Sequence, residues 1–246
     1  MLEGHDQLPL PLDTRAHPRT KRRPTPKAKP GQGRRRVPHR LRPEHADRHP
    51  VHVTLRATRH LPSLRHERIR ALVERILDGT RTPQGQVVHF SIQRDHLHLV
   101  VEASSKPELS SLLRRVVIRF ALRLNKLLGR AKGKVWDDRY HRRDLTSPRQ
   151  VRHVLAYVFT NAAKHGEGAF AVRVGLDPHS SAAGFDRWFG LSPVLRRLLT
   201  RERPRGPWRP PQPRTWLLHT GWWKTHGLLI FGLRPGRVEA TFPLTV

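Results

Sequence analysis

One stretch constrains the fold of this chain more than any other, and it runs from Asp95 to Glu102 with the sequence Asp-His-Leu-His-Leu-Val-Val-Glu. Its alternating apolar residues are Leu97, Leu99 and Val101. A period of two is typical of a β-strand, in which side chains two positions apart point to the same face. We therefore expect His96 and His98 to project together from the face opposite these apolar side chains.

The two histidines place two imidazole rings close enough to share one cation. Imidazole is a common ligand of divalent metals. However, the chain has 17 histidines, and an isolated His-x-His on a strand is more often a solvated pair than a metal site. The pair alone does not decide between these interpretations.

The charge of the chain indicates a polyanionic partner. Lys and Arg number 48 against 19 Asp and Glu, which gives a formal net charge of +29 over 246 residues. Nucleic acid is the first candidate and an anionic membrane surface the second. No apolar run approaches the roughly 20 residues that span a bilayer, and the N-terminus lacks the pattern of a secretory signal. We expect a protein that does not bind membranes.

The absence of cysteine restricts the chemistry. Disulfides, thiolate metal sites and cysteine nucleophiles are excluded. A metal must be held by histidine, carboxylate or amide oxygen, and a covalent intermediate must use Ser, Thr, Tyr, Lys or a carboxylate.

The hydrophobic patterns predict the order strand, helix, strand, strand, helix, strand, helix. The predicted elements are 51–55, 64–78, 87–92, 95–102, 105–128, 139–145 and 147–164. The first six match a ferredoxin-like α+β fold, which is an antiparallel sheet with two helices on one face. The additional seventh element is free to cover the histidines if they lie on the other face.

Composition divides the chain into three regions. Residues 1–48 are rich in Pro, Arg and Lys and are predicted to be a disordered basic arm, either a solvated tail or a source of phosphate affinity. Residues 49–167 form the folded domain, and residues 168–246 form a Pro/Arg/Trp-rich extension. Five of the six tryptophans lie after residue 187. They either pack the extension onto the domain or offer stacking surfaces for unpaired bases.

The last predicted helix of the folded domain carries polar side chains along one edge. At about 100° per residue, this edge holds His153, Tyr157, Asn161 and Lys164. Tyr157 and Asn161 are one turn apart and can face a common point. The simplest interpretation of Tyr157 is an aromatic at the edge of the core, and that of Asn161 is a residue near the helix end.

A phenol, a divalent cation and a phosphodiester also form a coherent chemistry. The cation polarises an oxygen of the phosphate, and the phenolate attacks phosphorus to give a phosphotyrosine. The phosphoester bond is conserved, so the strand can be passed on without an energy source. The chain has two tyrosines, and Tyr140 is the rival of Tyr157 as nucleophile.

Two stretches carry a family resemblance. Residues 95–100 resemble the histidine–hydrophobic–histidine motif of the HUH endonucleases. The stretch from Val135-Trp136-Asp137 to Asn161-Ala162 resembles the single-tyrosine transposases, in particular the REP-associated tyrosine transposases and their insertion-sequence relatives. The resemblance covers about residues 50–166 and implies a bacterial, cytoplasmic, nucleoid-associated homodimer that cleaves and rejoins single-stranded DNA, often beside a hairpin.

The resemblance also implies roles for individual residues. His96 and His98 would bind Mg²⁺ or Mn²⁺, Asn161 would complete the metal site, and Tyr157 would be the nucleophile, leaving a 5′-phosphotyrosine and a free 3′-hydroxyl. Two departures affect this assignment. Arg94-Asp95 stands where the family usually has Pro-Asn, and asparagine is one methylene shorter than the glutamine of some relatives. The third ligand therefore stays open between Asn161, Asp95 and the substrate.

Basic side chains outside the motifs are candidates for DNA contact, although a basic helix face is more often simply solvated. These candidates are Arg114, Arg115, Arg119, Arg123, Lys132, Lys134 and Lys164. Two other functions stay open: a non-catalytic, domesticated module that binds a single-stranded DNA hairpin, and a basic RNA-binding protein in which the histidine pair is incidental.

Overall fold

The computed structural model describes residues 42–164, 176–200 and 208–232. The elements of the folded domain are β1 (Val51–Arg56), α1 (Glu67–Asp78), β2 (Gly85–Ile92), β3 (His96–Ala103), α2 (Lys106–Leu127), β4 (His141–Asp144) and α3 (Pro148–Lys164). The extension adds a 3₁₀ turn (Ser181–Gly184), β5 (Trp188–Phe189), α5 (Pro193–Thr200), a π-helical turn (Leu217–Gly221), α6 (Trp222–His226) and β6 (Leu229–Ile230). No helix in these described ranges is both long and apolar enough to cross a bilayer.

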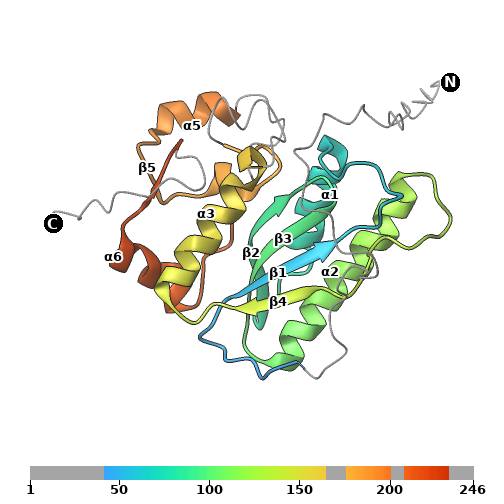
Figure 1. Ribbon diagram of the computed structural model, residues 1–246, viewed down its shortest axis with the longest axis horizontal. Coiled ribbons are helices and arrows are strands. Elements are labelled where there is room, and N and C mark those ends of the chain that lie inside the picture. The colour runs from blue at the N-terminus through green and yellow to red at the C-terminus, as the bar shows by residue number, and fades with distance from the viewer. Residues whose placement is uncertain (1–41, 165–175, 201–207, 233–246) are drawn as a thin grey trace, which may run out of the picture.

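The central sheet confirms the predicted ferredoxin-like α+β arrangement. Its four strands lie in the order β2-β3-β1-β4, and every neighbouring pair is antiparallel. Helices α1 and α2 lie on one side of the sheet, whereas α3 and the elements of the extension lie on the other (Figure 1). Helix α3, which is additional to the ferredoxin-like arrangement, therefore covers the face to which the histidines of β3 point.

Two apolar cores sandwich the sheet. The first core packs α1 and α2 against the inward residues of β1 and β3, which include Val53 and Leu99. The second core packs α3 and the extension against the opposite face, to which β3 contributes Val100. Burial on both faces explains why apolar residues are consecutive near the end of β3.

Helix ends follow local signals in the sequence. Ser105 caps α2 by accepting a hydrogen bond from the Glu108 N–H at 3.3 Å, and Ser147 accepts from the Gln150 N–H at 3.3 Å before α3. These serines satisfy amide groups that have no partner inside the helix. The predicted start of α1 was wrong. The Leu64 N–H bonds to the Arg94 carbonyl instead, and α1 begins three residues later, at Glu67.

The residues before β1 also contact the domain. Residues 1–41 of the expected basic arm lie outside the described residues. In the described end of that region, the Arg42 guanidinium lies 3.6 Å from the ring centroid of Tyr140, and His45 hydrogen-bonds to the Ala103 carbonyl at 2.8 Å.

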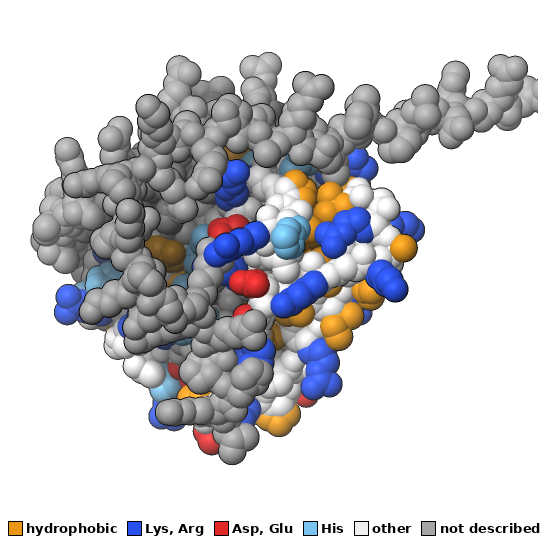
Figure 2. Space-filling view, turned by 45° about the vertical axis from the view of Figure 1, so that its right-hand side comes forward, with side chains coloured by type: hydrophobic (Ala, Val, Ile, Leu, Met, Phe, Trp, Pro, Cys, Tyr) orange, Lys and Arg blue, Asp and Glu red, His pale blue; other side chains and the backbone are white. Residues whose placement is uncertain are grey.

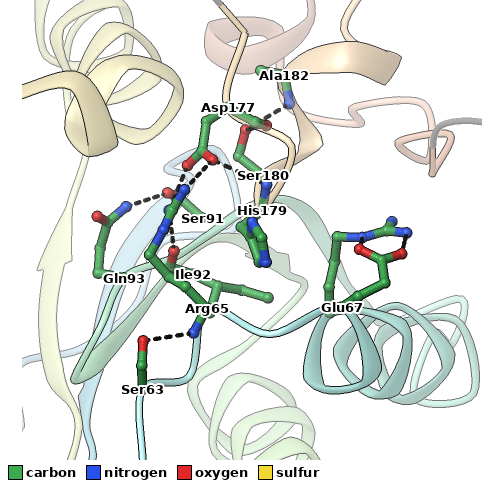
Figure 3. A network of polar contacts seen from close by, with 11 residues as sticks. Ser63, Arg65, Glu67, Ser91, Ile92, Gln93, Asp177, His179, Ser180 and Ala182 are labelled. Carbon is green, nitrogen blue, oxygen red and sulfur yellow. Dashed lines mark hydrogen bonds and ion pairs between the residues drawn. The ribbon is translucent and has the colours of Figure 1, made fainter. Parts of the chain in front are cut away.

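One contact of the extension covers the outer edge of β2. The guanidinium of Arg65 forms two hydrogen bonds to the Asp177 carboxylate at 2.7 and 3.0 Å and a third to the Ile92 carbonyl at 2.8 Å (Figure 3). The Ile92 N–H donates to the carbonyl of His179. A free strand edge invites pairing with other chains, and this segment of the extension occupies part of that edge.

A second contact ties the extension to β3. The buried carboxylate of Glu102 accepts hydrogen bonds from the backbone N–H groups of Arg214 and Thr215, from the Thr215 hydroxyl and from the Gln86 amide. On the other face of the sheet, the Trp208 ring packs against Phe90. The extension is therefore held against both faces.

The tryptophans of the extension differ in exposure. The buried ones, at 7% exposed or less, are Trp188, Trp208 and Trp222. For these three, the packing interpretation is confirmed. Trp216 is 60% exposed.

A buried histidine lies on the α3 side of the sheet. A bulge in β2 between Val87 and His89 places His89 opposite Val100. Its ring packs edge-on against Phe159 and Phe185. Burial lowers the pKa of His89 to about 3, so the ring is neutral in the folded protein.

We predict that stability falls as the pH decreases because of His89. In the unfolded chain the pKa is about 6.5, so between that value and the folded pKa of about 3 the unfolded state binds more protons. Stability is therefore at its full value above pH 6.5 with respect to this group, and it decreases by about 2 kcal/mol by pH 5. Urea denaturation at pH 7 and 5 should show that His89→Leu reduces the difference, whereas His60→Leu, at an exposed position, should not. An unchanged difference in His89→Leu would refute the assignment.

Candidate active site

A pocket of about 570 Å³ lies between the sheet and α3, next to the first residues of β3. Four elements line it: β1, β3, β4 and α3. The lining residues are His52, Thr54, Arg56, His96, His98, Arg143, His153, Val154 and Tyr157. All but Val154 are polar or titratable, and the two arginines give the pocket positive charge.

The two predicted histidines lie together in this pocket. The ring centroids of His96 and His98 are 4.7 Å apart, and the rings are nearly perpendicular at 88°. His98 is buried at 3% exposure, whereas His96 is half-buried. The alternation of side chains along β3 produces this arrangement.

A carboxylate orients His96. Its Nδ1 lies 2.7 Å from Oδ1 of Asp95, and the other oxygen of Asp95 accepts a hydrogen bond from Arg56 at 2.9 Å. The hydrogen bond with His96 is the main reason that the pKa of Asp95 lies well below its usual range, and Arg56 lowers it further. An ionised carboxylate at Nδ1 requires a proton there, so Nε2 of His96 carries the lone pair that a metal needs.

Two side chains of β1 contact His98. Its Nδ1 lies 3.2 Å from Nε2 of His52 and 3.2 Å from Oγ1 of Thr54. The His52 and His98 rings stack with centroids 5.3 Å apart. Burial is the main cause that lowers the pKa of His52 to about 4, so its ring is neutral at neutral pH. A neutral imidazole can accept the Nδ1–H of His98, which leaves Nε2 of His98 as the lone pair.

Tyr157 faces the same histidine from α3. Its hydroxyl lies 3.4 Å from Nε2 of His98, and the two ring centroids are 5.0 Å apart. Burial raises the pKa of Tyr157, and the nearby Asn161 carboxamide opposes that rise. The phenol is therefore protonated at neutral pH.

Asn161 is buried at 0% exposure one turn beyond Tyr157. Within the described residues, neither polar atom of its carboxamide makes a hydrogen bond of ordinary geometry, although the carboxamide lies close enough to the Tyr157 hydroxyl to lower the pKa of that group. A buried polar group without a partner costs about 1–3 kcal/mol. A ligand that reaches this carboxamide would offset that cost.

The other tyrosine lies elsewhere. Tyr140 packs against the first core, on the α1 and α2 side of the sheet, beneath the guanidinium of Arg42. It is not part of the pocket. Of the two tyrosines, the structure brings Tyr157 to the histidines.

The basic residues predicted for DNA contact do not gather at the pocket. Helix α2 lies on the opposite side of the sheet, in the region that Figure 2 brings forward, where Lys and Arg side chains alternate with apolar ones. There Arg115 and Arg119 donate to the carbonyls of Thr80 and Gly79. The exposed candidates of this group are Arg114, Arg119, Arg123, Lys132 and Lys134. The side chain of Lys164 lies outside the described residues.

Sequence reasoning missed four residues of the pocket. His52, Thr54 and Arg56 alternate with the inward residues of β1, and Arg143 lies on the neighbouring strand. The alternation alone indicates that the first three share a face. Only the register, which pairs Thr54 with His98, shows that this face is the one that carries the histidines.

The donor set fits a divalent cation, although no three His, Asp or Glu side chains within the described residues form a complete metal centre. The Nε2 atoms of His96 and His98 and the buried carboxamide of Asn161 are suitable donors. Asp95 is engaged at Nδ1 of His96, away from Nε2, and neither Asp95 nor Asn161 is among the residues that line the pocket.

Known proteins resemble part of this chain. No curated protein matches the chain. One similar solved structure is a REP-associated tyrosine transposase bound to a REP hairpin (14% identity, TM-score 0.47, covering 59% of this chain and 82% of that one). Another is a protein from Deinococcus radiodurans R1 described as a transposase (12% identity, TM-score 0.35, covering 55% and 99%). Residues 46–161 match the family model for IS200-like transposases. Residues 46–161, which include every residue that lines the histidine pocket, therefore resemble the IS200-like transposases.

Proposed function

We propose that this protein is a DNA strand transferase that cleaves and rejoins single-stranded DNA through a phosphotyrosine, with Tyr157 as the nucleophile. The observation that carries the proposal is the 3.4 Å separation between the Tyr157 hydroxyl and Nε2 of His98, in a pocket that His96 shares. The resemblance of residues 46–161 to a transposase family supports the same class of reaction.

The proposed metal site uses the two pocket histidines and Asn161, the buried residue one turn beyond Tyr157 on α3. His96 and His98 would hold Mg²⁺ or Mn²⁺ through Nε2, and Asn161 would contribute its amide oxygen. When bound, the ion would stabilise negative charge on the oxygens of the scissile phosphate. Asp95 keeps His96 in the required tautomer, and His52 and Thr54 do the same for His98.

The proposed reaction exchanges one phosphoester for another. The Tyr157 oxygen loses its proton and forms a bond to phosphorus, while the bond from phosphorus to the 3′ oxygen breaks. The 3′ oxygen takes up a proton and leaves as a hydroxyl, and the 5′ phosphate stays on the tyrosine. Attack by another 3′-hydroxyl reverses these steps and joins the strands. Because burial raises the pKa of Tyr157, removal of its proton is a substantial part of the barrier.

The charges around the pocket suit a nucleic-acid substrate. Arg56 and Arg143 line it, and guanidinium groups bind phosphates through several hydrogen bonds. The net charge of +29 adds affinity that depends on salt. We propose that the substrate is a DNA hairpin with a single-stranded flank and that the protein acts as a homodimer in the bacterial cytoplasm. These three points rest on the family resemblance.

We predict a covalent adduct that depends on Tyr157. With labelled single-stranded DNA from the flanks of its own gene and Mn²⁺, the protein should give a denaturation-resistant complex. Tyr157→Phe removes the attacking oxygen and should abolish the adduct, whereas Tyr140→Phe should retain it. Denaturing gels measure both. An adduct that survives in Tyr157→Phe contradicts the proposal, and binding without any adduct would identify a non-catalytic binding module.

We also predict that His52 supports metal binding without contacting the metal. His52→Ala removes one of the two acceptors for the Nδ1–H of His98, so the affinity for Mn²⁺ should fall by about 10- to 100-fold. Electron paramagnetic resonance of free Mn²⁺ measures this in the absence of DNA. His60→Ala alters an exposed histidine that follows β1 and is the matched control. Equal affinities in the two variants would exclude the orienting role of His52.

A further inference from the structure

A second pocket lies at the far end of β3. It has a volume of about 350 Å³, and Trp216 forms part of its wall. Among the described residues of the extension, Trp216 is the one tryptophan that is more than half exposed. Its lining residues are Asp47, Arg48, Pro83, Gln84, Glu102, Ala103, Ser104, Arg214, Thr215 and Trp216. An exposed indole offers a flat face on which an unpaired base can stack.

The second pocket lies at the opposite end of the strand that carries the active-site histidines. Glu102 lines it and is six positions after His96, so the two side chains point to the same face of the sheet. At about 3.3 Å per residue, the two positions are about 20 Å apart. Because α3 and the extension cover the sheet between the two positions, a DNA strand that contacts both pockets has to pass over that layer.

The ring of Trp216 has a defined position. A Cβ atom at Gly221 would lie only 2.5 Å from Cζ3 of the indole, so the ring lies close against the turn that follows it. Next to it, the N–H and hydroxyl of Thr215 donate to the buried Glu102 carboxylate at 2.9 and 2.8 Å. A ring held in this way loses little conformational entropy when a ligand stacks on it.

Two arginines and two acidic residues line the second pocket together with the ring. The Arg214 guanidinium donates to the carbonyls of Pro83 and Thr82 at 2.5 and 2.9 Å, which fixes its position. Arg48 also lines the pocket and is exposed, and Asp47 accepts a hydrogen bond from its backbone N–H. The Glu102 carboxylate is already bonded within the protein.

We propose that Trp216 is a stacking site for an unpaired base of single-stranded DNA, with Arg48 and Arg214 placed to face the neighbouring phosphates. An indole face accepts any base, and cationic groups beside an aromatic are typical of single-strand binding surfaces. The polar lining suits this ligand better than an apolar peptide. The assignment of DNA rests on the proposed function, and the site binds the strand away from Tyr157.

The test combines protein variants with DNA that lacks single bases. Fluorescence anisotropy measures the affinity of the full-length protein for labelled single-stranded flanking DNA, intact or with one abasic position moved along the strand. Trp216→Ala should weaken binding of the intact strand on the order of tenfold, and Trp216→Phe should keep most of the affinity. Phe189→Ala is the matched control because Phe189 is 51% exposed.

The decisive result is non-additivity between the two changes. At one or two abasic positions, the loss of the base should weaken binding to the unaltered protein. The same loss should not weaken binding to the Trp216→Ala variant any further. Additive effects at every position would overturn the proposal, as would the same coupling with RNA but not with DNA. The adduct assay with Tyr157→Phe is a separate readout, so failure of base stacking and failure of the proposed reaction give different results.

Discussion

The antiparallel pairing of β1 with β3 determines the chemistry of this protein. Its register sets Thr54 opposite His98 and brings His52 within 3.2 Å of the same ring. The same alternation sends the leucines of β3 into the core under α1 and α2. A shift by one residue would bury the histidines and expose the leucines. The apolar core therefore maintains the position of the polar pocket, although the two lie on opposite faces of the sheet.

Local patterns were sufficient to predict much of this architecture, and long-range contacts account for the rest. The alternation around His96 and the serine cap at Ser105 are read from neighbouring residues, and the structure confirms both. His52 was missed because strand register depends on pairing between segments far apart in the chain. For the extension, the composition indicated that tryptophans could pack it onto the domain but not where it lies. Its position depends on distant contacts, such as that of Glu102 with Thr215, that no periodicity shows.

The candidate active site concentrates unfavourable features that the rest of the fold stabilises. Burial raises the pKa of Tyr157, the carboxamide of Asn161 makes no hydrogen bond of ordinary geometry within the described residues, and His52 is buried as a neutral ring. Each lowers stability compared with an apolar residue of similar size. The packing of α3 between the sheet and the extension offsets this cost. Such a combination is typical of sites arranged for a ligand rather than for stability.

The extension contacts elements that form both pockets. It packs against α3, which carries Tyr157, and it is bonded to Glu102 at the end of β3, whose other end carries His96. Strand β3 and the layer formed by α3 and the extension therefore contribute to the walls of both pockets. A strand of DNA held at two points on a rigid element loses its freedom before reaction, and this orientation lowers the barrier to attack. The extension would then contribute to the reaction by fixing the substrate, without supplying a reacting group.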